Sequence, residues 1–300
     1  MLNVVFWGEK SLSVSCLKYL LQQPNINVLV VCTRKISPVW WGDQVLRLFC
    51  ERQAIPILDF DHIGDFQIDW HISVLYPFIL SKEVLKKARL GCVNLHEAPL
   101  PRWKGCNGYA HAILEEDVCY GTTLHSMQPE LDSGDVYCSQ SFEIDPHETV
   151  KELYNRTTEA SLALFSENIN AILFNKLPIS QKTQSIQGDT YLNTRGSLIQ
   201  DKDLSRQSNW KSIYRKARAL DFEPWEPAFY DLNQDRYYVF IKGSGGRVAI
   251  SGGIKRILDV SRSIDYYCSK NQVIELTFFE RILIICPSNI YRKYFSCWNF

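Results

Sequence analysis

The sequence lacks several features that would identify its class at once. No uninterrupted apolar run approaches the ~18 residues that a membrane-spanning helix needs, and the formal net charge of zero gives no reason to expect a nucleic-acid partner. None of the ten cysteines forms a C-x-x-C pair, which argues against a zinc ribbon or a redox motif. The first turn holds one glycine where a dinucleotide fingerprint needs G-x-G-x-x-G, and no G-x-S-x-G elbow for a nucleophilic serine occurs.

Further absences concern the compartment and metal binding. No signal peptide is expected, because Glu9 and Lys10 interrupt the N-terminal apolar run. The expected absence of a signal peptide, together with cysteines that form no C-x-x-C pair, predicts a reducing, cytoplasmic compartment. Residues 181–300 hold 18 Lys+Arg and 12 Asp+Glu, so polyanion binding stays open for this part of the chain. No metal site is predicted, and five histidines without metal-ligand spacing are interpreted as non-catalytic: His62, His71, His111, His125 and His147.

What is present predicts an α/β domain. Hydrophobic residues make up 46% of the chain, enough for a sizeable core. Leu2–Trp7 and Asn27–Cys32 are read as buried strands. The helix between them is expected to be capped by Ser11 or Ser13 and to end at Pro24, with an apolar side that includes Leu17, Leu20 and Leu21. This βαβ opening predicts a Rossmann-like sheet, parallel or mixed, with flanking helices.

The pattern continues through residue 178. Further strands are expected at 55–58, 70–75, 91–95, 121–127 and 135–142. Helices are expected at 43–53, 82–88 (capped by Ser81), 108–114 and 145–175. Asp145-Pro146-His147-Glu148 supplies the predicted start of the last helix, with a capping residue, a proline and a glutamate in favourable order.

Composition then divides the chain. Residues 1–178 are predicted to form the catalytic domain, and the polar segment 179–208 a linker. Residues 209–300 are predicted to form a smaller β-rich domain that could be a barrel. It would open with a basic helix at 210–219 and continue with short strands and glycine turns at 237–241, 243–246, 248–250 and 273–279.

The segment Cys92–Asp135 concentrates the residues that could carry chemistry. Asn94 and His96 lie two apart on a predicted strand and so share a face. An amide can stabilise an oxyanion, an imidazole can move a proton, and the carboxylate of Asp132 could orient that imidazole. The trio suits transfer of a carbonyl group without a covalent intermediate. Taken alone, a histidine at a strand end is more often structural than catalytic.

The combination of motifs is more specific than its parts. Asn94-Leu95-His96 is followed by Pro99–Gly105 (PLPRWKG), Gly121–His125 (GTTLH) and Leu131–Asp135 (LDSGD). This order resembles the folate-dependent formyltransferase family over about residues 1–180, and again over residues 210–239. The resemblance implies that Asn94, His96 and Asp132 are catalytic.

The resemblance also implies a donor and its binding residues. The family's co-substrate is N10-formyltetrahydrofolate, whose pterin lies beside the strand end before the N-x-H strand and in the loop that carries the aspartate. Here those positions are Tyr76, Pro77, Phe78 and Ile79, and Gln128, Leu131 and Ser133.

The acceptor is the open question. Glu97-Ala98-Pro99 looks more like the sugar N-formyltransferases than like the purine enzyme of the family. The loop Thr33–Gly42 is short and has only Arg34 and Lys35 as basic residues, whereas methionyl-tRNA formyltransferases carry a long basic insertion there. A nucleotide-linked amino sugar is therefore favoured, and a homodimer is expected by resemblance. A methionyl-tRNA formyltransferase, a formyltetrahydrofolate hydrolase and a non-catalytic binding module remain alternatives. Candidate acceptor contacts are Lys10, Ser11, Lys82, Asn107, Gly108 and Tyr109, while Trp40, Trp41 and Trp225 could stack on a base.

Overall fold

The computed structural model describes most of the chain in two compact units. The described residues are 1–34, 44–58, 66–180, 191–193, 198, 200–207, 209–222, 225–241, 255–257, 273–278 and 281–295. One unit comprises Met1–Cys106, Tyr120–Phe142 and Arg156–Asn193, and the other comprises Asn107–Cys119, Glu143–Asn155 and Thr194–Phe300. The units therefore interleave along the chain. The predicted boundaries at residues 178 and 208 stay a prediction about independently folding domains.

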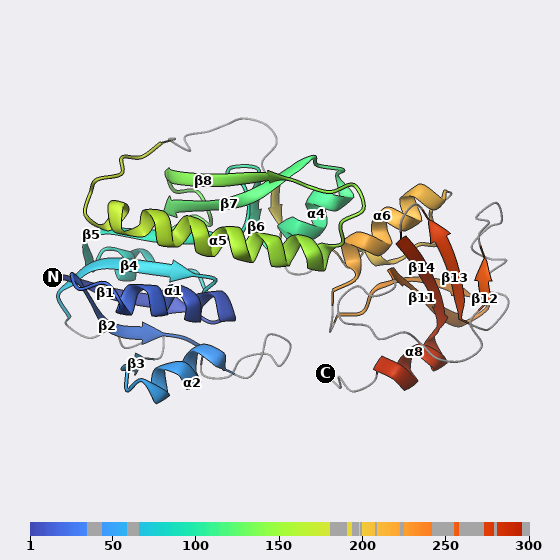
Figure 1. Ribbon diagram of the computed structural model, residues 1–300, viewed down its shortest axis with the longest axis horizontal. Coiled ribbons are helices and arrows are strands. Elements are labelled where there is room, and N and C mark those ends of the chain that lie inside the picture. The colour runs from blue at the N-terminus through green and yellow to red at the C-terminus, as the bar shows by residue number, and fades with distance from the viewer. Residues whose placement is uncertain are drawn as a thin grey trace. The chain divides into compact units, whose positions relative to one another are not determined.

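The first unit is built on a seven-stranded sheet with the order β3-β2-β1-β4-β5-β7-β8 (Figure 1). Its strands are β1 Leu2–Gly8, β2 Ile26–Cys32, β3 Ile57–Leu58, β4 Ile68–Val74, β5 Ala88–His96, β7 Cys119–Ser126 and β8 Val136–Glu143. The strands from β3 to β5 pair in parallel, and β7 joins β5 antiparallel. The predicted α/β fold with a mixed sheet is thereby confirmed.

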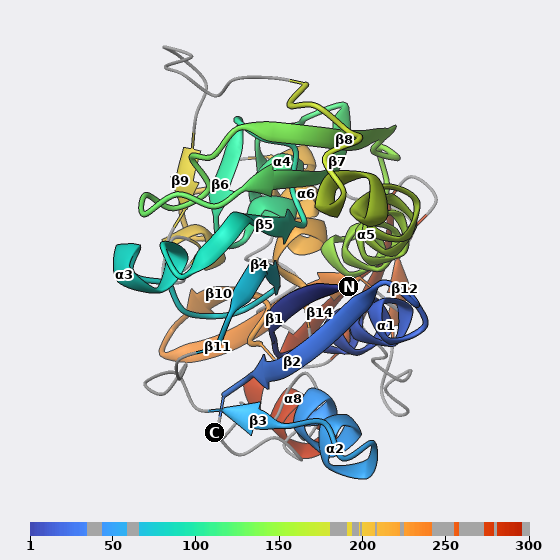
Figure 2. The ribbon, with the colours of Figure 1, turned by 90° about the vertical axis from the view of Figure 1, so that its left-hand side faces the viewer.

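Helices cover both faces of this sheet. Figure 2 shows α1 (Ser11–Leu21) and the long α5 (Val150–Leu173) along one face, with α3 (Lys82–Leu85) on the other. A further helix, α2 (Val45–Arg52), follows β2. Alternation along β1 explains the two layers, because Val4 and Phe6 join the core under α1 and α5 while Val5 and Trp7 join the core on the opposite face. Burial on both faces accounts for the continuous apolar runs of the parallel strands.

Two expected helix starts were wrong. Helix α5 begins at Val150, five residues after Asp145, because Thr149 and Glu152 cap it reciprocally: Glu152 Oε2 accepts from the Thr149 N–H at 2.8 Å, and Thr149 Oγ1 accepts from the Glu152 N–H at 3.4 Å. Asp145–Glu148 closes a separate turn, in which Glu148 Oε2 accepts from the Asp145 N–H at 3.2 Å.

Helix α1 is preceded by Lys10 as its N-cap residue, and no side chain caps it. The hydroxyl of Ser13 instead donates to the Val74 carbonyl at 2.6 Å and accepts from the Glu9 N–H at 3.2 Å, which ties the first turn to β4. Leu21, predicted on the apolar side, is 43% exposed. In α3, by contrast, the expected cap is confirmed, since Ser81 accepts from the Val84 N–H; that helix ends at Leu85, because Ala88 already belongs to β5.

The predicted linker contributes a strand to the first unit. β9 (Tyr191–Asn193) pairs in parallel with β6 (Trp103–Gly105), the strand at the end of the PLPRWKG loop. The polar composition of residues 179–208 did not indicate this pairing.

The second unit contains α4 (Gly108–Leu114), the short helix η2 (Gln200–Lys202), α6 (Trp210–Leu220) and a five-stranded sheet. Asn209 caps α6 by accepting from the Ser212 N–H at 2.9 Å. The sheet has the order β10-β11-β14-β13-β12. Its strands are β10 Ala228–Leu232, β11 Asp235–Ile241, β12 Lys255–Ile257, β13 Ile274–Phe278 and β14 Arg281–Pro287, and α8 (Ser288–Phe295) follows.

The β-rich C-terminal region is thus confirmed, while the described strands form an open sheet with β10 and β12 as edges, not a barrel. The strands and turns expected at residues 243–253 lie outside the described residues. Within the part of the chain that is described, no helix is long and apolar enough to cross a membrane.

Candidate active site

Strand β5 carries Asn94 and His96 on one face, with Cys92 before them. β5 pairs in parallel with β4 and antiparallel with β7, and the register sets Asn94 opposite His125. Asn94 and His96 therefore lie within the paired part of β5, directly beside residues of β7.

The imidazole of His96 is oriented by a backbone carbonyl. Its Nε2 lies 2.8 Å from the Trp103 oxygen. Because a carbonyl only accepts, Nε2 carries the proton, and Nδ1 carries the lone pair in the neutral ring. Nδ1 lies 3.7 Å from Oδ2 of Asp132. A basic nitrogen thus faces a carboxylate that stabilises the imidazolium when Nδ1 takes up a proton.

Asp132 is itself held by the backbone. Its Oδ2 accepts from the Gly105 N–H at 2.9 Å, the side chain is largely buried, and its own φ of 48° lies in the left-handed region. Gly134 makes this turn possible, since a Cβ at that position would come within 1.6 Å of the Ser126 carbonyl oxygen. The L-D-S-G-D turn therefore closes tightly on the end of β7 and delivers the carboxylate beside His96.

His125 links the amide to the carboxylate. Its Nδ1 lies 2.7 Å from the Ser126 carbonyl oxygen and therefore carries the proton. Its Nε2 accepts from the side-chain amide of Asn94 at 3.0 Å and lies 3.6 Å from Oδ1 of Asp132. Asn94, His125, Asp132 and His96 consequently form one connected group. The interpretation of His125 from metal-ligand spacing overlooked this contact, although its place in the G-T-T-L-H motif could have indicated it.

Burial keeps His125 neutral. Its ring is only 2% exposed, and its pKa is lowered to about 4, chiefly by this desolvation; Asp132 opposes the shift, and the neighbouring His96 adds to it. A neutral ring presents a lone pair at Nε2, so it accepts from Asn94 and fixes the amide with its nitrogen toward β7. The second N–H of that amide remains available for another acceptor.

The residues predicted to hold the donor include unusually exposed apolar side chains. Phe78 is 49% exposed, Ile79 is 59% exposed and Leu131 is 40% exposed. Tyr76 packs edge-to-face against Trp7 and Phe78, with ring centroids 5.3 and 5.6 Å apart. Exposed apolar surface of this kind suits a flat ligand that would cover it.

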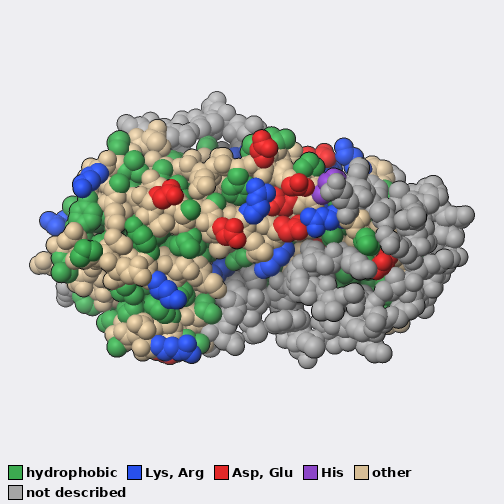
Figure 3. Space-filling view, in the orientation of Figure 1, with side chains coloured by type: hydrophobic (Ala, Val, Ile, Leu, Met, Phe, Trp, Pro, Cys, Tyr) green, Lys and Arg blue, Asp and Glu red, His purple; other side chains and the backbone are tan. Residues whose placement is uncertain are grey.

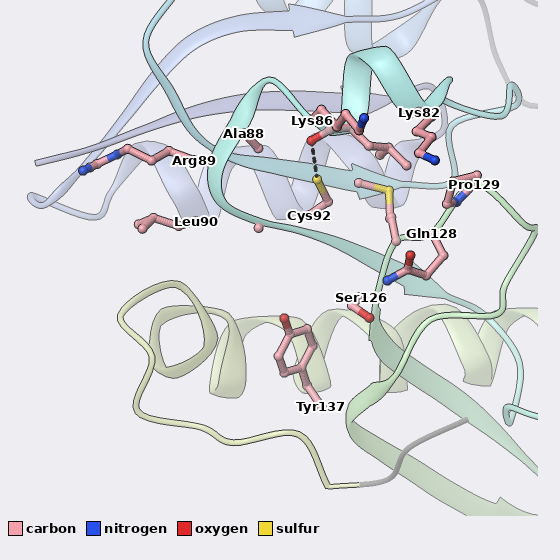
Figure 4. A pocket seen from close by; sticks show the side chains of 13 residues that line it. Lys82, Lys86, Ala88, Arg89, Leu90, Cys92, Ser126, Gln128, Pro129 and Tyr137 are labelled. Carbon is pink, nitrogen blue, oxygen red and sulfur yellow. Dashed lines mark hydrogen bonds between the residues drawn. The ribbon is translucent and has the colours of Figure 1, made fainter. Parts of the chain in front are cut away.

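A pocket of about 380 Å³ opens beside this region, with walls from α3, β5, the loop after β7 and β8 (Figure 4). It is lined by Lys82, Leu85, Lys86, Ala88, Arg89, Leu90, Gly91, Cys92, Ser126, Met127, Gln128, Pro129 and Tyr137. Gln128 belongs to the predicted donor contacts, and Lys82 was predicted to contact the acceptor. Because Cys92, Asn94 and His96 share one face of β5, a ligand seated in the pocket can extend along that face toward the amide and the imidazole.

The other predicted contacts are scattered. Lys10 and Ser11 lie at the start of α1, and Ser133 donates its hydroxyl to the Glu130 carbonyl at 2.9 Å. Asn107, Gly108 and Tyr109 open α4 in the second unit, where Tyr109 packs edge-to-face on Tyr154.

Of the three tryptophans suggested to stack on a base, Trp40 and Trp41 lie outside the described residues. Trp225 is 45% exposed. Among the described residues, no group of three or more His, Cys, Asp or Glu side chains is arranged to hold a metal ion.

The sequence motifs did not indicate one charged pair, which lies just after the carboxyl end of β1. Glu9 follows β1 and is 2% exposed, and its Oε1 pairs with Nε of Arg34 at 2.9 Å. The guanidinium carbon of Arg34 also lies 5.2 Å from the ring centroid of Phe78. Arg34 is therefore engaged within the protein, between β1 and the Tyr76–Ile79 segment.

Comparisons with known proteins found a family match and similar sequences. Residues 52–169 match the family model described as formyl transferase. The chain is 29% identical over 240 residues to the methionyl-tRNA formyltransferase of Magnetococcus marinus, covering 76% of this chain and 75% of that protein. It is 27% identical over 251 residues to the corresponding enzyme of Legionella pneumophila, covering 78% and 76%.

Solved structures share the fold. The N-formyltransferase from Helicobacter canadensis, in complex with folinic acid and dTDP-3-aminofucose, is 18% identical with a TM-score of 0.66, covering 96% of this chain and 99% of that chain. The methionyl-tRNA formyltransferase from Clostridium thermocellum is 17% identical with a TM-score of 0.54, covering 82% and 95%.

Proposed function

Because the chain belongs to the folate-dependent formyltransferase family, we propose that it moves a formyl group from N10-formyltetrahydrofolate to the amino group of a nucleotide-linked amino sugar. The observation that carries the reaction is the connected group of Asn94, His125, Asp132 and His96. It places an amide donor, a basic nitrogen and a carboxylate together at the end of β5.

Asn94, His96 and Asp132 have separate roles. The free N–H of Asn94 donates to the oxygen on which negative charge develops as an acceptor amine attacks the formyl carbon. Nδ1 of His96 takes the proton that this amine loses, and Asp132 stabilises the resulting imidazolium. The imidazolium then returns the proton to N10 of the folate as the bond between N10 and the formyl carbon breaks, which releases tetrahydrofolate. A fixed oxyanion donor is typically worth ~3–4 kcal/mol, and a positioned proton acceptor contributes ~10²–10⁴ in rate.

The donor fits the surface beside this group. The pocket of about 380 Å³ offers apolar walls from Leu85, Met127 and Tyr137, and Phe78 and Ile79 add exposed apolar area nearby. Such walls suit the flat pterin ring, and Gln128 offers polar partners for its edge. Lys82 and Lys86 in the pocket lining suit the carboxylates of folate, whereas Arg89 pairs with Asp69 at 2.7 Å.

The amino-sugar acceptor is supported by the chemistry of the first loops. Arg34, one of the two basic residues of the Thr33–Gly42 loop, pairs with the buried Glu9. On the face seen in Figure 3, basic and acidic side chains of the described residues are interspersed, without an extended basic field. Binding of the tRNA phosphate backbone through the described part of this face would need such a field. We further propose, from the resemblance, a cytoplasmic homodimer.

A methionyl-tRNA acceptor is the second candidate, favoured by relatives of that name at 27–29% identity and by the basic excess of residues 181–300. A panel assay separates the two. N10-formyltetrahydrofolate is offered with dTDP-, UDP- and GDP-linked amino sugars, with methionyl-tRNA, and with no acceptor. Asp132→Asn serves as the control for background.

Formylation of one nucleotide sugar is the expected result. Turnover with methionyl-tRNA and with none of the nucleotide sugars would show that tRNA is the acceptor. Formate release without any acceptor would identify a hydrolase. No turnover in any arm would overturn the proposed reaction.

A further inference from the structure

Three hydroxyl groups of β7 hold the peptide segment that follows His96. Thr122 Oγ1 donates to the His96 carbonyl at 3.0 Å, Tyr120 donates to the Glu97 carbonyl at 3.0 Å, and Thr123 donates to the Ala98 carbonyl at 2.8 Å. Three successive carbonyls that leave the sheet at the end of β5 are thus each satisfied by a side chain.

Helix α5 extends one of these contacts. Ser161 donates its hydroxyl to Thr122 Oγ1 at 2.7 Å. Each hydroxyl has a single proton, so the direction of the chain is determined: Ser161 donates to Thr122, and Thr122 donates to His96. Both side chains are fully buried, which means that water cannot replace either contact. Successive hydrogen bonds of this kind polarise and strengthen one another.

A second hydroxyl on the same side of α5 binds the next residue. Thr158 lies three residues before Ser161, so the two share one face of the helix. Thr158 Oγ1 donates to Oε1 of Glu97 at 2.9 Å, and Glu97 is 5% exposed. Residues 96 and 97 are therefore bound from two elements, β7 and α5.

We propose that Thr122 and Ser161 are positioning residues for His96. The imidazole of His96 is fixed at its far end by the Trp103 carbonyl, and the hydroxyl chain fixes the peptide from which it projects. With both ends held, Nδ1 keeps its direction toward Asp132. The inference rests on the proposed role of His96 in formyl transfer.

Thr122→Val removes the hydroxyl at nearly constant volume, and Thr122→Ser restores it. We expect Thr122→Val to lower kcat about tenfold, because a small misplacement of a catalytic group has an effect of this size or larger. The KM for N10-formyltetrahydrofolate and the Kd for the probe 5-formyltetrahydrofolate should change less than twofold. Thr122→Ser should recover most of kcat.

The ring nitrogens of His96 provide a readout independent of turnover. In the native protein their ¹⁵N chemical shifts should report one tautomer, with the proton on Nε2, and Thr122→Val should show a mixture of tautomers. Ser161→Ala should give a smaller change in the same direction, and it carries the test if Thr122→Val does not fold. Ser166→Ala is the matched control, because its hydroxyl donates to the Ala163 carbonyl within α5 itself.

The outcomes are distinct. Native kcat and an unchanged His96 tautomer in a folded Thr122→Val protein would overturn the proposal. So would a Thr122→Ser protein as impaired as Thr122→Val, since the hydroxyl would then be irrelevant. If the native protein shows no turnover with any acceptor, the proposed function fails, while the ¹⁵N shifts still decide whether the hydroxyl chain orients His96.

Discussion

Asn94 donates its side-chain amide to Nε2 of His125 at 3.0 Å, across the antiparallel pair of β5 and β7. The bond requires a neutral imidazole, which burial supplies by lowering the pKa of His125 to about 4. It leaves one N–H of Asn94 directed away from β7. His125 therefore sets the direction in which the amide can stabilise charge.

Replacing His125 should consequently impair the reaction without removing a catalytic group. His125→Ala frees the Asn94 amide to rotate, and we expect kcat to fall by ~10². His125→Gln offers a carbonyl oxygen to the same amide and should retain more activity. Steady-state kinetics with N10-formyltetrahydrofolate measure both; equal losses in the two variants would contradict an orienting role.

The carboxylate of Asp132 should act through its charge. Asp132→Asn preserves shape and removes the negative charge that stabilises the His96 imidazolium, so kcat should fall by ~10²–10⁴. Asn94→Ala should lower kcat by ~10²–10³, as expected for an oxyanion donor. Both variants should unfold within a few degrees of the native protein in a thermal melt. Near-native turnover in Asp132→Asn would disprove the charge argument.

The exposed ring of Phe78 should serve donor binding more than chemistry. Phe78→Ala removes apolar surface beside the pocket, and we expect the Kd for 5-formyltetrahydrofolate to rise about tenfold. The kcat at saturating donor should change little. Calorimetric titration measures the affinity, and Phe66→Ala, which removes another exposed phenylalanine, is the control. The same loss in both variants would exclude a specific donor contact.

Gly134 should be intolerant of any side chain. A Cβ there would overlap the Ser126 carbonyl, so Gly134→Ala must displace the turn that carries Asp132. Overpacking of this kind costs about 1–3 kcal/mol. Chemical denaturation measures the loss, with Ser133→Ala as a neighbouring control whose hydroxyl donates to the nearby Glu130 carbonyl. Equal stability of Gly134→Ala and the native protein would contradict the close approach.

Two buried histidines should make stability depend on pH. Burial lowers the pKa of His125 and of His71 to about 4, whereas both titrate near 6.5 in the unfolded chain. Between these values the unfolded state binds more protons, so the free energy of unfolding falls as the pH drops from about 6.5 to about 4. Each histidine accounts for up to ~3 kcal/mol.

Urea unfolding at several pH values measures this dependence. His71→Gln should remove about half of it, because one of the two depressed groups is gone. A native protein whose unfolding free energy is constant between pH 7 and 4.5 would show that neither ring is held neutral.

The sequence by itself predicted the seven strands of the first unit's main sheet. Apolar runs such as Leu2–Trp7 must be buried on both faces, and this predicted the parallel sheet and the strands that flank the site. Asn94-Leu95-His96 and the L-D-S-G-D turn at Asp132, through their resemblance to the formyltransferase motifs, predicted the three groups, because each motif is contiguous along the chain.

Only the tertiary structure decided how those groups meet. The start of α5 depended on which of two residue pairs caps the helix. Thr149 and Glu152 cap it, whereas Asp145 and Glu148 close a separate turn before it. The role of His125 depended on the register between β5 and β7, which sets it opposite Asn94. Strand register and burial arise from packing between distant segments, and for that reason no local pattern could state that His125 is neutral and oriented toward the amide.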